Sequence, residues 1–175
     1  AFELFAKSLF RLRNPVQVLV QLHPRSDGSY EQQVLDKLAH DHPNFPRYFI
    51  SNPAAHLNSF EAVAISQVGV CHRSTLAIQA LFAGKPFVHV DVPGTPFSSF
   101  GIEKGLIPQA TKPVDATRAI DDLLDKKEFD LSTIYEKVGL ISEGTKRIRA
   151  FLELLVYQSQ HQPSAEEKEA TPSNR

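Results

Sequence analysis

The 175-residue sequence has one cysteine, no methionine and no tryptophan. A lone Cys71 cannot form an intrachain disulfide, so we expect a protein of a reducing, cytoplasmic compartment. The formal net charge is −1 and the basic residues are scattered, which argues against nucleic acid as a partner. No apolar run approaches the roughly 20 residues that a membrane span needs, so none is expected.

Two common phosphate-binding motifs are absent as well. The sequence contains neither a Gly-x-Gly-x-x-Gly pattern nor a Walker pattern. The chain also opens at Ala1-Phe2 without an initiator methionine, and we expect a fragment whose N-terminal part is missing.

Helical and strand-like patterns alternate along the chain. Helices are predicted over residues 2–13, 30–40, 59–65, 74–83, 115–126 and within 142–158, and strands over 16–22, 47–50, 67–71 and 86–92. Short connections between alternating elements predict a Rossmann-like α/β fold, a parallel sheet with helices on both faces. We expect one such domain over residues 1–161. Residues 162–175 are polar and charged, and a disordered tail is predicted there.

Polar residues follow two of the predicted strands, where ligands of such sheets usually bind. His23-Pro24 ends the first strand, and Cys71-His72-Arg73-Ser74-Thr75 leads from the third strand into a helix. Free N–H groups at the start of that helix, the Ser74 and Thr75 hydroxyls and the charge of Arg73 together predict a diphosphate site.

Each of these residues also has a plainer interpretation. His23 could simply end a strand, Ser74 and Thr75 could form an ordinary N-cap, and Cys71 is expected to be an inert buried thiol. His89 and Asp91 share one face of the last predicted strand, but no third ligand is evident in the sequence. We therefore interpret them as a solvated or sheet-end pair and predict no metal site.

The segment from Gln67 to Pro86 resembles the C-terminal domain of GT-B glycosyltransferases and UDP-N-acetylglucosamine 2-epimerases, with capsule-polysaccharide-type members nearest. Its pattern is an apolar strand, a small polar turn, a helix and then Ala-Gly-Lys-Pro. His-Pro at the earlier strand end and Phe100-Gly101-Ile102-Glu103-Lys104-Gly105 add to the likeness, which extends over roughly 16–156.

The resemblance implies one half of a GT-B enzyme, which binds a nucleotide-sugar donor, UDP-sugars being favoured, beside a missing N-terminal domain. It implies no cofactor. Arg73, Ser74 and Thr75 then meet the donor diphosphate, and the base lies against Ile50 and Ser51.

Gln79 stands where many members of the family have a glutamate that binds the ribose. An amide hydrogen-bonds a hydroxyl but lacks the charge of a carboxylate. Two alternatives stay open: an epimerase-like domain with His23 and His72 as catalytic candidates, and a binding module without activity.

Overall fold

The computed structural model describes residues 1–52, 56–94, 97–126 and 130–138, and its main compact unit spans Ala1–Lys137. The predicted helix within 142–158, the domain boundary at 161 and the predicted tail over 162–175 lie outside the described residues. Among the residues described, no helix is long and apolar enough to cross a membrane.

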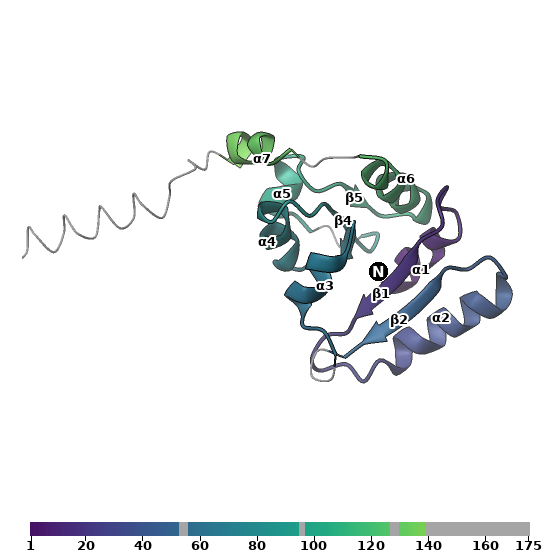
Figure 1. The fold of residues 1–175 in the computed structure, drawn as a ribbon. Coiled ribbons are helices and arrows are strands. Elements are labelled where there is room, and N and C mark those ends of the chain that lie inside the picture. The colour runs from purple at the N-terminus through teal and green to yellow at the C-terminus, as the bar shows by residue number, and fades with distance from the viewer. Residues whose placement is uncertain (53–55, 95–96, 127–129, 139–175) are drawn as a thin grey trace, which may run out of the picture. The chain divides into compact units, whose positions relative to one another are not determined.

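Helices and strands alternate in the predicted order from α1 to β4, and the predicted helix over 115–126 corresponds to α6 (Figure 1). The strands are β1 (Gln17–Gln21), β2 (Arg47–Ser51), β3 (Gly69–Cys71), β4 (Phe87–Val90) and β5 (Gln109–Ala110). The helices are α1 (Phe2–Leu9), α2 (Ser29–Asp41), α3 (Ser59–Ile65), α4 (Leu76–Phe82), α5 (Phe100–Glu103), α6 (Pro113–Leu124) and α7 (Leu131–Val138).

All paired strands run parallel, which confirms the Rossmann-like α/β class. In the described part of the chain they form two small sheets, β1–β2 and β3–β4–β5, rather than the one sheet expected. β3 is only three residues long and pairs with β4 alone. A sequence pattern reveals strands but not which of them pair.

Apolar clusters hold the elements together, and among the described residues α1 contributes to two of them. One packs Ala6 and Leu9 of α1 against Val18 and Val20 of β1 and Leu35 of α2. In the other, partly buried residues of α1 pack against a cluster of β4, β5 and α6 residues. Leu35 is fully buried, and burying such a side chain contributes about 1.5–3 kcal/mol.

Local signals decide where several elements begin and end. The Asn58 side chain accepts hydrogen bonds from the N–H groups of Phe60 and Glu61, and Glu61 accepts from the Asn58 N–H, which forms the capping box of α3. Gly84 ends α4 at a φ of +73°, a value that favours glycine. The helix predicted over residues 59–65 is confirmed with the same bounds.

Candidate functional site

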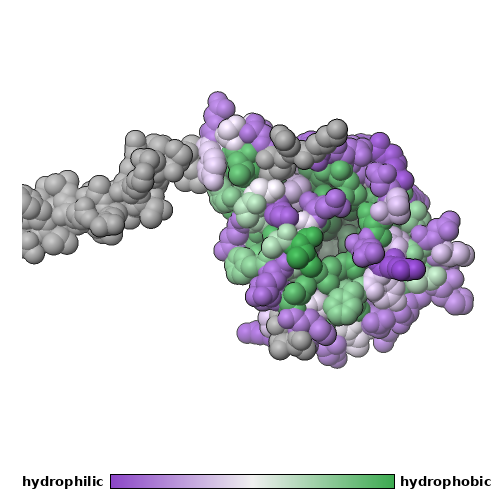
Figure 2. All heavy atoms as spheres, viewed as in Figure 1, coloured by the Kyte–Doolittle hydropathy of each residue, from purple (hydrophilic) through white to green (hydrophobic). Residues whose placement is uncertain are grey.

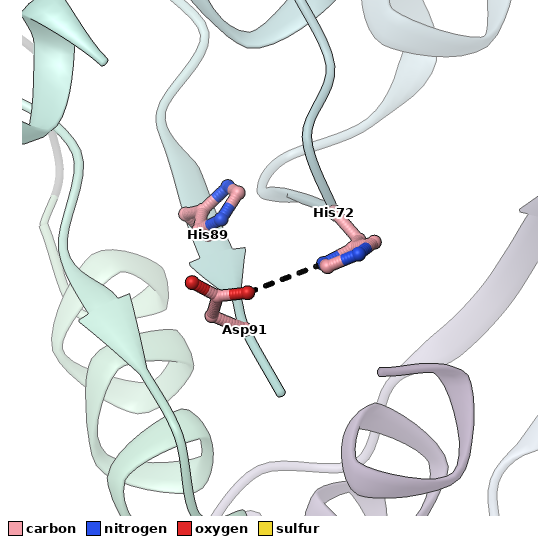
Figure 3. Close-up of side chains that lie close together, drawn as sticks. All are labelled: His72, His89 and Asp91. Carbon is pink, nitrogen blue, oxygen red and sulfur yellow. Dashed lines mark ion pairs between the residues drawn. The ribbon is translucent and has the colours of Figure 1, made fainter. Parts of the chain in front are cut away.

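The candidate site lies at the carboxyl ends of β3 and β4, which meet at one edge of their sheet. The register pairs Cys71 with His89, so that the residue after β3, His72, reaches the end of β4. Figure 3 shows His89 on β4, Asp91 just beyond the end of β4, and His72 beside them after the neighbouring strand. One potential ligand atom of each residue lies within 4.8 Å of those of the other two.

His89 and Asp91 are buried, with 2% and 1% of their surfaces exposed. Of the two interpretations offered for this pair, a solvated pair is therefore wrong, whereas a pair at the sheet end is confirmed, because His89 lies near the end of β4 and Asp91 follows it. β4 is the middle strand of its sheet, and every residue in it is buried. Alternate residues share a face of a strand, so the two side chains point the same way.

Three donors hold the Asp91 carboxylate in place. The N–H groups of Val92 and Phe97 donate at 2.9 and 2.8 Å, and Gln109 Nε2 donates at 3.3 Å. Burial alone would raise the pKa of Asp91. The hydrogen bonds from the two backbone N–H groups and the nearby Arg73 and His89 outweigh that effect, so the pKa lies below its ordinary value. Asp91 is thus ionised at neutral pH.

The His89 ring stacks against two other rings. The centroid of Phe97 lies 5.0 Å away and that of His72 6.0 Å away. Its Nε2 atom is buried and has no hydrogen-bond partner among the described residues. Burial lowers the pKa of His89, against the opposing effect of Asp91, so the imidazole is neutral at neutral pH.

The turn after β3 brings polar and charged groups to the same edge. His72 Nδ1 lies 2.8 Å from the carbonyl oxygen of Val90 and 3.8 Å from Asp91 Oδ1. Arg73 Nη2 is 3.9 Å from the same Asp91 oxygen, and its guanidinium carbon lies 5.7 Å from the Phe97 ring centre. Arg73 has a φ of +50°, which costs a non-glycine residue about 1–2 kcal/mol.

A backbone held in such a conformation fixes the direction of the side chain, and strained residues gather at functional sites. Beside it, burial raises the pKa of the Cys71 thiol to about 11. That shift agrees with the inert thiol expected from the sequence.

The other predicted residues lie in the turn before α4, on α4 itself and in the β1–β2 part of the fold. Ser74 Oγ accepts from the Leu76 N–H at 3.2 Å, while Thr75 is exposed and its side chain makes no cap hydrogen bond. The helix begins at Leu76, later than predicted, and Ser74 and Thr75 belong to the turn. Gln79 lines a cavity of about 290 Å³ with residues of α3 and α4.

His23, Ile50 and Ser51 belong to the β1–β2 part of the fold. The exposed His23 accepts from the Arg25 N–H through Nδ1 at 3.2 Å, in the loop after β1. Ile50 packs on the first apolar cluster, and Ser51 is fully buried at the end of β2. In the described residues no hydrogen bond, ion pair or ring contact joins His23 to His72.

The comparisons with known proteins add no further assignment. No protein-family model, curated protein or solved structure matches the chain. The geometry of the chain's own residues therefore carries the functional argument.

Phe97 and Gln109 join the site without having been predicted. Gln109 Nε2 donates to Asp91 Oδ2 and, at 3.0 Å, to the Phe97 carbonyl. Gln109 lies in a strand of two residues, too short for an alternating pattern. Phe97 follows a Pro/Gly-rich stretch without periodicity, so no local signal points to either residue.

Proposed function

We propose that this chain is the donor-binding domain of a glycosyltransferase and binds a nucleotide sugar at the carboxyl edge of β3. The observation that carries the proposal is the turn from Arg73 to Thr75. Arg73, whose backbone conformation is restrained, is followed directly by Ser74 and Thr75 with their hydroxyl groups. Gln79, which lines the cavity, comes about one helical turn after Thr75. A guanidinium and two hydroxyls suit an anionic diphosphate, whereas the cavity beside Gln79 is lined mainly by apolar side chains and adds the Gln79 amide and Lys85.

The attraction for phosphate is assigned mainly to Arg73 and the hydroxyls. α4 has seven residues, so its dipole adds little. The Arg73 side chain is 43% exposed, which leaves it accessible to a ligand beside its contact with Asp91. Guanidinium and hydroxyl groups would stabilise the diphosphate leaving group as negative charge develops during transfer.

A partner half is part of the proposal. In the view of Figure 2, apolar residues gather in the middle of the face and hydrophilic residues surround them. Apolar surface of this kind supports a further domain covering it, with the acceptor site and any catalytic base.

Titration calorimetry with UDP-, GDP- and CMP-sugars tests the proposal. The Ser74→Ala/Thr75→Ala double variant should bind the preferred donor about 1–3 kcal/mol more weakly, the usual effect of losing hydrogen bonds to a charged group. Ser132→Ala/Thr133→Ala is the matched control, because these residues form a Ser-Thr pair at the start of α7, where both hydroxyls donate to Asp130. Equal affinity of the wild type and the Ser74/Thr75 variant would contradict the proposal.

A binding module without transferase activity is the second candidate. Gln79 favours it, because an amide forms weaker hydrogen bonds to a ribose than a carboxylate does. Binding of the nucleotide without turnover after the missing half is supplied would select this candidate.

A further inference from the structure

The cluster of His72, His89 and Asp91 offers three metal-binding side chains at one point. Their ligand atoms lie within 4.8 Å of one another. Donor atoms about 2.0–2.2 Å from one ion lie about 3.3–3.6 Å apart around a tetrahedron. The ligand atoms would therefore have to approach by at most about 1.5 Å, and His72, at 37% exposed, is the least buried of the three residues drawn in Figure 3.

His89 gives an independent reason to expect a ligand. Its Nε2 atom is buried without a hydrogen-bond partner among the residues that the structure describes, and a buried polar atom left unpaired is destabilising. Stacking on Phe97 and His72 keeps the ring from turning toward solvent. A metal ion beside Nε2 would give this nitrogen the partner that it lacks.

Asp91 is held as a metal-binding carboxylate usually is. Metal ligands are typically oriented by hydrogen bonds from outer groups, and here the Val92 and Phe97 N–H groups and the Gln109 amide supply them. A carboxylate and a neutral imidazole are also the protonation states that bind metal at neutral pH.

We propose that His72, His89 and Asp91 bind a divalent transition-metal ion, for which Zn²⁺ is the best match. Two imidazoles and one carboxylate suit Zn²⁺ and its neighbours, whereas Mg²⁺ and Ca²⁺ prefer oxygen ligands. Three protein ligands leave at least one coordination position for water or for a substrate oxygen. The proposal does not depend on nucleotide-sugar binding, since the metal alone tests it.

Arg73 modulates this site. Its guanidinium lies 3.9 Å from Asp91 Oδ1 and therefore competes with a cation for that carboxylate. Removing the charge should strengthen metal binding, whereas removing a ligand should weaken it. A loss of folding cannot produce these two opposite effects.

The test is calorimetric titration of the chelator-treated protein with Zn²⁺, supported by the visible absorption of bound Co²⁺. His72→Gln and Asp91→Asn should each lower Zn²⁺ affinity by about 10–100-fold or more. Losing a group that merely hydrogen-bonds a metal ligand already causes a loss of that size. Arg73→Gln should raise it several-fold. Circular dichroism confirms folding, and His72→Gln changes an exposed side chain, so it should fold even if Asp91→Asn does not.

His40→Gln is the matched control. His40 pairs with Asp41 at 3.1 Å on the surface, an imidazole and a carboxylate without a third ligand. Its substitution should leave Zn²⁺ affinity unchanged. The proposal is overturned if His72→Gln binds Zn²⁺ within twofold of the wild type, or if His40→Gln weakens binding as much as His72→Gln does.

Discussion

Gly69 is the position where a single added methyl group should disturb the site most predictably. It begins β3 and pairs in register with Phe87, which begins β4. A Cβ at position 69 would lie 2.2 Å from Phe87 Cζ and 2.4 and 2.5 Å from its two Cε atoms. The aromatic ring thus covers the glycine on the strand pair that leads to His72, His89 and Asp91.

The expected cost follows from that geometry. The ring must recede by about 1.2 Å before the Cζ contact reaches the 3.4 Å at which ordinary contact begins, yet Phe87 is only 4% exposed. Overpacking of this kind costs about 1–3 kcal/mol, partly offset by the 0.5–1 kcal/mol that alanine gains over glycine in a strand. Gly69→Ala should therefore lower the free energy of unfolding by about 1–2 kcal/mol.

Urea unfolding of a double-mutant cycle tests the reasoning. Phe87→Leu removes the Cε1, Cε2 and Cζ atoms that the new methyl group would meet. In that background Gly69→Ala should cost nothing or stabilise slightly, which gives a coupling energy of at least about 1 kcal/mol. If the two substitutions add within about 0.5 kcal/mol, the clash between the new methyl group and the Phe87 ring is not the cause of the lost stability.

Three further predictions concern other parts of the chain. Gln79→Glu should tighten a ribonucleoside diphosphate several-fold in calorimetry and leave a 2′,3′-dideoxy analogue unaffected, because a carboxylate accepts stronger hydrogen bonds from ribose hydroxyls; equal effects on both ligands would refute the ribose assignment. Asn58→Ala should cost about 1 kcal/mol in thermal unfolding, since it removes the capping box of α3, and an unchanged melting temperature would contradict this. The Ser132 and Thr133 hydroxyls hold the pKa of Asp130 at about 2, so its contribution to stability is complete above about pH 4 and declines as the pH falls toward 2. The stability difference between the wild type and Asp130→Asn should shrink over that range, and a constant difference would count against the assignment.

The fold could be predicted largely from local signals. The capping residues of α3, the glycine that ends α4 and the alternation of apolar runs all carry their information within a few neighbouring residues. Local signals weaken where an element is short, and α5, β5 and α7 were not predicted. α7 depends on tertiary contacts, such as the stacking of Tyr135 on Phe82 at 6.1 Å.

The candidate site could be predicted only in part, because its residues come from four separate segments. The turn at His72 and Arg73 was identified from its place between a strand and a helix. The pairing of β3 with β4, which the sequence does not reveal, brings His72 to His89 and Asp91 and buries the pair. The third residue of the cluster, His72, comes after the neighbouring strand, so the sequence around His89 and Asp91 could not reveal it.

The central claim is that a nucleoside diphosphate binds at the turn after β3. Amide chemical shifts of the ¹⁵N-labelled chain, recorded by NMR as UDP is added, test it most directly. The account predicts that the amides of Arg73, Ser74, Thr75 and Gln79 move together and saturate at one dissociation constant. Saturable shifts confined to other parts of the chain, or no shift at millimolar UDP, would contradict it.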